Sequence, residues 1–275
     1  MRKTAASRMS VFHSFRLDGK VAIVTGAHAW LGHDVACALA EAGASVAVTS
    51  RELARAEETA EKIQRQYGVD TLALALDQRH HGQVKAMAER AHAWKGRIDI
   101  LVNNAGGGSG KGECHLLKRR PEDEADLIAT NLVGVLFCCK EVARFMVEQG
   151  SGKVVNIASM AGLVGRDRRL YEHSGLKGQP VDYAAAKGGV IAMTKDLAGL
   201  LSPLGVHVNC ISPGGFDKGE LPERFVQEYA ERTMLGRMGR MGVDIKGAAL
   251  FLASPASDYV TGHNLVVDGG FSVWK

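Results

Sequence analysis

Two residues near the middle of the chain have the types and the spacing of a proton-transfer pair. Tyr183 and Lys187 lie four residues apart in Val-Asp-Tyr-Ala-Ala-Ala-Lys-Gly, and Ser159 precedes them in Asn-Ile-Ala-Ser. On a helix, side chains four residues apart share one face. A lysine ammonium beside a phenol favours the phenolate and lowers the tyrosine pKa. A serine hydroxyl can hold the substrate oxygen that gains or loses the proton. A surface tyrosine–lysine pair on an ordinary helix is the alternative interpretation.

A glycine-bearing turn near the start of the chain has the features of an anion site. Residues 20–25 are a short β-branched apolar run that predicts a buried strand, and residues 34–42 predict a helix. The turn Gly26-Ala-His-Ala-Trp-Leu-Gly32 lies between them. Backbone N–H groups and the helix dipole favour phosphate there, and glycines allow the backbone to approach a pyrophosphate. A plain turn between a strand and a helix is the alternative.

The rest of the chain alternates short apolar strands with longer helices. Strands are expected at 20–25, 44–50, 71–76, 98–103, 153–157, 206–211 and 264–267, and helices at 34–42, 54–67, 82–95, 121–149, 181–201 and 245–253. This alternation predicts an α/β fold, a Rossmann-type doubly wound parallel sheet of about seven strands in a single domain. Right-handed crossovers place all the carboxyl ends of the strands at one edge, where ligands bind. Residues at or just after these ends are Gly26, Ser50, Asp77, Asn103 and Ser159.

Composition is typical of a globular enzyme. The 275 residues are 46% apolar and 23% charged, which suits one large domain. No apolar run approaches the roughly 20 residues that span a membrane. The five cysteines have no paired metal-ligand spacing, so we expect no metal site and reduced thiols in the cytoplasm.

The net charge of +4 comes from the start of the chain. Residues 1–16 hold four basic residues and no acid, and the remainder has 30 basic and 30 acidic residues. The basic stripe of a nucleic-acid-binding domain is therefore not expected. We interpret residues 1–16 as a flexible basic extension and 17–275 as the domain. A targeting segment, or a start codon at Met9, is the alternative.

Taken in order, the motifs resemble those of the short-chain dehydrogenase/reductase family, in its single-domain branch. The matching positions extend from about residue 17 to the C-terminus: Thr25-Gly26 through Gly32, Asp77, Asn103-Asn104-Ala105-Gly106, Asn131, Ser159, Tyr183, Lys187, Pro213-Gly214 and Val267-Asp268-Gly269-Gly270. The resemblance implies an NAD(P)-dependent oxidoreductase that interconverts a carbonyl group and a secondary alcohol by hydride transfer.

The resemblance also implies roles for four catalytic residues. Tyr183 is the general acid or base, Ser159 orients the carbonyl, and Lys187 holds the nicotinamide ribose and lowers the Tyr183 pKa. Asn131 kinks its helix and orders a water that relays protons through the lysine. A core asparagine with satisfied hydrogen bonds is the alternative for Asn131.

Cofactor contacts are expected along the same edge of the sheet. The second strand ends in Ser50-Arg51, where NAD-binding sites carry an acid for the ribose 2′-hydroxyl. An arginine can pair with a 2′-phosphate, a bond worth about 1.5–3 kcal/mol, so NADP(H) is favoured over NAD(H). The alternative for Arg51 is a solvated side chain without a cofactor contact. By resemblance Asp77 lies near the adenine, and its alternative role is a helix N-cap. For the glycines of 106–110 the alternative is a flexible loop. The expected contacts are Gly26, His28, Trp30, Leu31, Gly32, Ser50, Arg51, Asp77, Gln78, Asn104, Ala105, Gly106, Tyr183, Lys187, Pro213, Gly214 and Phe216, while Asn103 holds strands together.

Three features depart from the family pattern. Trp30 occupies the second glycine position of the turn, and no threonine follows Pro213-Gly214. Ser159 and Tyr183 are 24 residues apart, where the family commonly has about half that. The extra segment, 166–179, also carries Tyr171, a rival phenol without a lysine four residues on. Its charged residues are Arg166, Arg168, Arg169, His173 and Lys177 against Asp167 and Glu172.

The inserted segment 166–179 bears on the choice of substrate. Folded over the cleft, the segment 166–179 could favour a carboxylate or phosphate; a solvated lid or an oligomer contact is the alternative. Residues 213–224 are expected to be the mobile substrate loop. A polyol, sugar or sugar acid is favoured over a fatty or steroid ketone.

Two other functions compete with the reductase interpretation. A non-catalytic NADP(H)-binding regulator would retain the nucleotide site without turnover. A nucleotide-sugar epimerase or dehydratase would need a C-terminal substrate domain, for which the residues past Leu252 are too few. The ending Val-Val-Asp-Gly-Gly-Phe resembles the family's last strand, which often packs in a tetramer, so a homotetramer or homodimer is expected.

Overall fold

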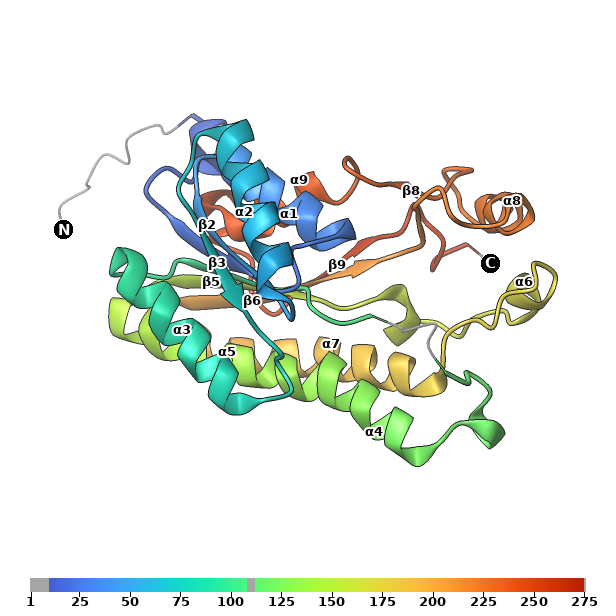
Figure 1. Ribbon diagram of the computed structural model, residues 1–275. Helices are drawn as coiled ribbons and strands as arrows, with labels where there is room; N and C mark the ends of the chain where they lie inside the picture. The colour runs from blue at the N-terminus through green and yellow to red at the C-terminus, as the bar shows by residue number, and fades with distance from the viewer. Residues whose placement is uncertain (1–9, 108–111, 275) are drawn as a thin grey trace.

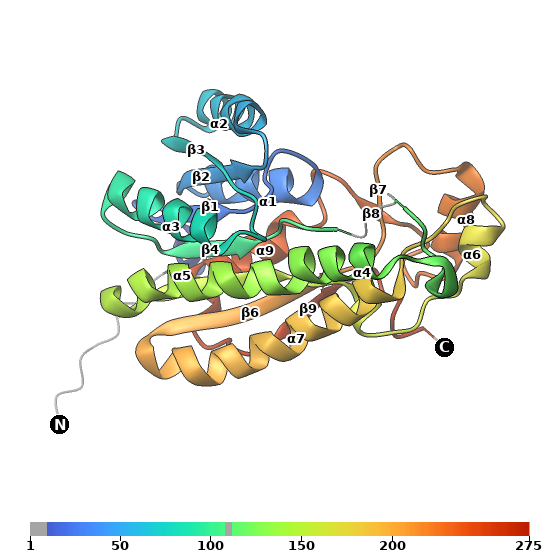
Figure 2. The same cartoon turned by 60° about the horizontal axis from the view of Figure 1, so that its bottom comes forward.

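The computed structural model describes residues 10–107 and 112–274. A seven-stranded parallel sheet forms the middle layer, with helices on both faces (Figures 1 and 2). The strands, in sheet order, are β3 (Thr71–Ala75), β2 (Ser45–Ser50), β1 (Val21–Val24), β4 (Ile100–Asn103), β5 (Gly152–Ile157), β6 (Val206–Pro213) and β9 (Asn264–Val267). The doubly wound parallel sheet predicted from the sequence is confirmed.

Alternate side chains of each strand enter two separate apolar cores. Ala22 and Val24 of β1 pack on one face, and Ile23 packs on the other. Because both of its faces are covered, β1 is apolar along its whole length. The helices on the first face are α1 (Trp30–Glu41), α2 (Leu53–Tyr67) and α9 (Lys246–Ala253), and those on the second are α3 (His81–Lys95), α5 (Gly134–Gln149) and α7 (Val181–Leu201).

The direction of winding reverses between β1 and β4. The chain proceeds from β1 to β2 and β3 on one side, then crosses back to β4, β5 and β6 on the other. Val24 therefore has Val48 of β2 as one neighbour and Val102 of β4 as the other. Loops that leave β1 and β4 diverge above this point and leave a crevice at the carboxyl ends, which is where open α/β sheets bind ligands.

The long helix expected at 121–149 is interrupted by a π-helical turn. It consists of α4 (Pro121–Ile128), a π-helix (Ala129–Val133) and α5. Single π turns within α-helices are frequent at functional sites. The first helix also begins at Trp30, four residues before the expected start at 34, because the turn itself forms the first helical residues.

The region beyond the carboxyl ends of the strands differs most from expectation. The segment expected as a loop at 213–224 contains β7 (Phe216–Asp217), which pairs with β8 (Gly239–Arg240), and the start of α8 (Glu223–Glu231). The segment 166–179 contains the short helix α6 (Arg169–Glu172). Helices α6 and α8 lie side by side beyond the sheet (Figures 1 and 2).

Short 3₁₀ helices complete the described chain. They are His13–Phe15, Leu116–Lys118, Met160–Gly162, Ser202–Leu204 and Pro255–Ser257. The first of them lies within the predicted basic extension, of which residues 1–9 are outside the described ranges. Leu17, which follows this 3₁₀ helix, is buried.

Candidate active site

A cavity of about 1000 Å³ opens at the carboxyl ends of the strands. Its volume is at the upper end of the range for ligand pockets, so a dinucleotide and a small substrate can share it. Every site residue predicted from the sequence lines it. These are Gly26, His28, Trp30, Leu31, Gly32, Ser50, Arg51, Asp77, Gln78, Asn104, Ala105, Gly106, Asn131, Ser159, Tyr183, Lys187, Pro213, Gly214 and Phe216.

The glycine turn packs tightly against the end of β4. Gly26 has φ +63°, and a Cβ there would lie 2.8 Å from the Ala105 Cα. A Cβ on Gly32 would lie 2.2 Å from the Asn104 side-chain nitrogen, which donates to the carbonyls of Thr25 and Gly26. Both positions therefore require glycine. The N-cap of α1 makes no side-chain bond, so the first N–H groups of the helix are free to bind a pyrophosphate.

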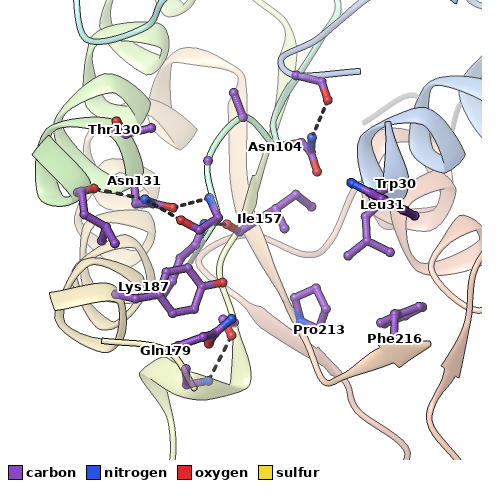
Figure 3. A pocket seen from close by; sticks show the side chains of 18 of the residues that line it. Trp30, Leu31, Asn104, Thr130, Asn131, Ile157, Gln179, Lys187, Pro213 and Phe216 are labelled. Atoms are coloured by element: carbon purple, nitrogen blue, oxygen red, sulfur yellow. Dashed lines mark hydrogen bonds between the residues drawn. The ribbon is translucent and has the colours of Figure 1, made fainter. Parts of the chain in front are cut away.

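Trp30 adopts the backbone conformation that glycine favours. Its φ of +54° makes it the only non-glycine residue with positive φ in the described ranges. This conformation explains why glycine is the usual residue at this point of the turn. The Lys218 ammonium lies 4.1 Å from the Trp30 ring centroid, so the loop after β6 covers the turn. Trp30 and Leu31 face Asn131 and Lys187 across the cavity (Figure 3).

The end of β2 is positively charged. Arg51 is exposed at the cavity wall, and the Ser50 hydroxyl accepts a bond from the Glu52 N–H. Burial, and then the charges of Arg55 and Arg51, lower the pKa of His28 below its usual range. The charges of two arginines thus act next to the glycine turn.

The residues after β3 are engaged by their own neighbours. Asp77 accepts bonds from the Arg79 guanidinium, which lowers the pKa of Asp77 to about 2. The N-cap of α3 is His80, so the alternative that Asp77 caps this helix is wrong. Gln78 donates to the carbonyls of Ala105 and Thr130, so its amide connects the β4 loop to the π-helix.

Asn131 accounts for the π-helical turn. Its side-chain nitrogen donates to the Leu127 carbonyl at 3.1 Å and to the Gly107 carbonyl at 3.2 Å, and its oxygen accepts from the Gly107 N–H at 2.8 Å (Figure 3). A side chain that takes a helix carbonyl opens the regular ladder. The helix distortion implied by the family resemblance is therefore present, and it fixes the loop after β4.

Asn103 joins neighbouring strands, as the resemblance implies. Its side-chain nitrogen donates to the Asn156 oxygen at 2.8 Å, across the β4–β5 pair. Both residues are buried, so this bond satisfies polar groups inside the sheet.

Ser159, Tyr183 and Lys187 meet where β5 ends. The Ser159 oxygen accepts from the Ala161 N–H at 3.1 Å, which leaves the hydroxyl proton free to be donated. Lys187 donates to the Ile157 carbonyl at 2.7 Å, and its ammonium lies 5.8 Å from the Tyr183 ring centroid. The helix α7 carries both side chains on one face, as their spacing predicted.

The predicted effect of Lys187 on the Tyr183 pKa is wrong for the protein without cofactor. Tyr183 is buried against Leu127 and Ala161, and this burial raises its pKa, opposed only in part by Ser159 and the charge of Arg166. Burial also lowers the pKa of Lys187 to about 8. Burial is therefore the main cause of the pKa shift of both groups.

The loop after β6 is held by a tyrosine that the sequence did not reveal. The Tyr229 hydroxyl of α8 accepts from the Gly215 N–H at 2.6 Å and donates to the Met160 sulfur. Phe216 is buried next to it. The only sequence signal for Tyr229 is its apolar spacing from Phe225 on one helix face.

A buried ion pair supports the start of α7. Arg119 donates to the Asp182 carboxylate at 2.9 Å, and their side chains are 2% and 8% exposed. Arg119 also donates to the Glu113 and Asp123 carbonyls. Since Asp182 directly precedes Tyr183, this pair fixes the helix end that carries the phenol. No motif in the sequence identified either residue.

Comparison with known proteins identifies the family. A family model described as enoyl-(acyl carrier protein) reductase matches residues 26–272. The 5-keto-D-gluconate 5-reductase of Escherichia coli strain K12 is 36% identical over 266 residues, which cover 94% of this chain and 98% of that protein. The chain belongs to the short-chain dehydrogenase/reductase family. It is therefore an NAD(P)-dependent oxidoreductase that interconverts a carbonyl group and a secondary alcohol, as the sequence predicted, and not a non-catalytic regulator.

Other members of the family are similar to the same degree. The 3-oxoacyl-[acyl-carrier-protein] reductase of Staphylococcus aureus strain Mu50 is 36% identical over 259 residues, covering 91% of this chain and 97% of that protein. The crystal structure of a gluconate 5-dehydrogenase from Burkholderia cenocepacia, in complex with NADP and tartrate, is 34% identical. It has a TM-score of 0.86 and covers 96% of this chain and 99% of that one.

Within 10–107 and 112–274, no group of three or more His, Cys, Asp or Glu side chains is arranged to hold a metal ion. In the same ranges no helix has the length and apolarity needed to cross a bilayer. All five cysteines are free and buried.

Proposed function

We propose that Ser159, Tyr183 and Lys187 are the catalytic residues of a reductase for small polar carbonyl compounds. The observation that carries this proposal is their meeting at one wall of a cavity whose opposite wall is the glycine turn. A bound nicotinamide would supply or accept the hydride at the carbon between these walls. The protein's own side chains then have to move a single proton.

Tyr183 can serve as the proton donor in the reductive direction. A phenol is protonated at neutral pH, and burial that raises the pKa of Tyr183 keeps it so, which leaves its proton available to a carbonyl oxygen that receives hydride at its carbon. Ser159 donates its free proton to the same oxygen and orients it. Lys187 contributes a buried amine beside the phenol. Both N–H groups of the Asn131 side chain donate to backbone carbonyls, those of Gly107 and Leu127. A water that relays protons would therefore have to donate to an Asn131 oxygen.

We propose NADP(H) as the favoured cofactor. Arg51 is supported in this role by its place in the cavity wall beside the glycine turn. Its guanidinium would pair with a 2′-phosphate, whereas Arg55 is already paired with Glu52, the acid two residues after β2.

The proposed substrate is a polyol, sugar or sugar acid, bound either as the ketone or as the corresponding secondary alcohol. Support comes from two polar side chains on the substrate side of the cavity, Arg166 and Gln179, which lie among apolar residues such as Leu176, Leu221 and Phe271. The similarity to a 5-keto-D-gluconate 5-reductase points in the same direction. The equally similar 3-oxoacyl reductase makes acyl substrates the competing class to include in any panel.

We also propose a cytoplasmic homotetramer or homodimer that forms through β9. This strand lies at the edge of the sheet, and exposed apolar residues follow it, with Val273 66% and Trp274 53% exposed. A monomer in light scattering would overturn this assignment.

The reductase proposal is tested by replacing one phenol and keeping another. Tyr183→Phe is expected to lower turnover by about 10²–10⁴-fold, because it removes the proton donor. Tyr171→Phe is the matched control, since Tyr171 lines the same cavity and no lysine follows it four residues on. Nicotinamide absorbance with NADPH and NADH, over ketones, sugars and sugar acids, gives the readout. Near-normal turnover of Tyr183→Phe would remove Tyr183 from the mechanism.

A further inference from the structure

The segment 166–179 forms a fixed wall of the cavity. Leu170 of α6 packs in an apolar cluster with Phe225, Tyr229 and Met238. The Tyr171 and Phe225 rings lie 5.2 Å apart. These contacts anchor α6 on α8, which lies beside it (Figures 1 and 2). Arg166 and Asp167, which precede α6, line the cavity.

Arg166 stands out in this wall because its hydrogen-bond partners are neutral. Its guanidinium donates to the Gln179 side-chain oxygen at 2.8 Å and to the Pro180 carbonyl at 3.0 Å. These bonds fix the plane of the group, and Gln179 itself lies below Lys187 in the cavity (Figure 3). A guanidinium has five N–H donors; these two bonds and the neighbouring Tyr171 hydroxyl engage part of them, and the others remain for a ligand.

The other charges of the segment are already paired or turned elsewhere. Asp167 accepts from Arg169 at 2.9 Å and lies 3.5 Å from Arg232. Arg168 donates to the Gln179 carbonyl at 2.5 Å. Within the described ranges no ion pair involves Arg166, which is partly buried and lines the cavity with Ser159 and Tyr183.

Arg166 is also within electrostatic reach of the reacting group. Its positive charge lowers the pKa of Tyr183, against the larger effect of burial. Arg166 and Tyr183 line the same cavity, so one substrate molecule held in it can meet both side chains. The phenol would bond to the carbonyl oxygen and the guanidinium to a second polar group of the same molecule.

We propose that Arg166 selects substrates that carry a carboxylate, namely hydroxy acids and keto acids of the sugar-acid type. The fixed fork of an arginine matches the two oxygens of a carboxylate, and such bonds are stronger than those to a hydroxyl. This inference rests on the proposed reductase function. It makes Arg166 a specificity-determining residue in a segment that lengthens the Ser159–Tyr183 interval.

The test compares one keto acid with its neutral analogue. The acid is 5-keto-D-gluconate, and the analogue is the ketohexose with a hydroxymethyl group in place of the carboxylate. For the wild type, kcat/KM is expected to favour the acid. Arg166→Gln should lower kcat/KM for the acid about 10- to 100-fold, because a charge-assisted bond is lost, and leave the analogue nearly unchanged. Arg166→Lys should restore part of the preference, since the charge returns without the fork.

Arg169→Gln is the matched control. It removes an arginine of the same segment that is 75% exposed, is paired with Asp167 and does not line the cavity. Its preference for the acid should equal that of the wild type. Equal losses for both substrates in Arg166→Gln would show that Arg166 only supports the segment, and an unchanged preference would show that it contacts no carboxylate. Either result overturns the inference.

A binding measurement separates failure of the inference from failure of the reductase proposal. Thermal unfolding of the NADP-saturated protein is followed with tartrate, a dicarboxylate, and with threitol, its neutral analogue. Stabilisation by tartrate alone, lost in Arg166→Gln, supports carboxylate recognition even if no substrate turns over. Absence of turnover on every substrate would then overturn the reductase proposal, and tartrate stabilisation that persists in Arg166→Gln would overturn the role of Arg166.

Discussion

The two sides of the cavity are built by different means. On the cofactor side, the parallel ladder of β1, β2 and β4 positions the residues, and backbone contacts as close as those of Gly26 and Gly32 define the surface. On the substrate side, arginines hold irregular segments by their carbonyls. Arg119 bonds to Glu113 and Asp123, and Arg166 to Pro180.

This difference explains which side of the cavity can change its shape by substitution. A strand ladder fixes its residues through bonds that any side chain permits, but it leaves little room at the glycine turn. Arginine-to-carbonyl bonds fix a loop through single side chains, so one substitution can reposition a wall without disturbing the sheet. A fold built in this way can keep one cofactor site and vary the substrate it accepts.

The most severe test of the comparison is to break the buried pair on the substrate side. Arg119→Met should lower the free energy of unfolding by about 3–5 kcal/mol, because Asp182 is left charged and buried without a partner. Denaturant unfolding measures the change. Arg120→Met is the control: its side chain is 72% exposed, so loss of its pair with Asp123 should cost about 0–1 kcal/mol.

A double variant sharpens this test. Replacing both partners, as in Arg119→Met with Asp182→Leu, removes the unpaired charge and should recover much of the lost stability. If Arg119→Met costs no more than Arg120→Met, the substrate side does not depend on its buried arginine, and the contrast between the two sides is wrong.

The next test exchanges a charge on the cofactor side. Arg51→Asp should reduce the preference for NADPH over NADH by about 10- to 150-fold, because a bond of about 1.5–3 kcal/mol to the 2′-phosphate is lost and replaced by repulsion. The ratio of kcat/KM for the two cofactors is the measurement. Arg65→Asp makes the same charge change at the other end of α2, where it should have little effect. An unchanged ratio in Arg51→Asp would refute the assignment of Arg51.

The sequence predicted the cofactor side well because its signals are local. Strand ends follow from short apolar runs, and α7 has the predicted bounds Val181–Leu201. The glycine turn and Asn104 lie at these ends, so their convergence on one cavity needed only the rule that parallel strands end at one edge. The same rule placed Ser159 after β5.

The substrate side was less predictable because its determinants are distant in the chain. The pairing of Arg119 with Asp182 spans 63 residues, and neither position stands in a motif. The contact of α6 with α8 depends on packing between Leu170 and Phe225, which the spacing of apolar residues in the sequence does not predict. The Tyr183 pKa was predicted in the wrong direction for the same reason, since spacing gives the neighbour at Lys187 but not the burial around the ring.

The last test concerns Lys187, which lies where the two sides meet. Burial lowers its pKa from 10.5 to about 8, so between these values the unfolded chain binds more protons than the folded one. Its contribution to stability therefore rises with pH in this window and is constant below it. From pH 8 to 9, the wild type without cofactor should gain about 1 kcal/mol relative to Lys187→Met. Lys195→Met, on the exposed face of α7, should match the wild type. Equal pH slopes in wild type and Lys187→Met would mean that the bond to the Ile157 carbonyl keeps the ammonium charged, and that the buried amine beside Tyr183 is a permanent cation.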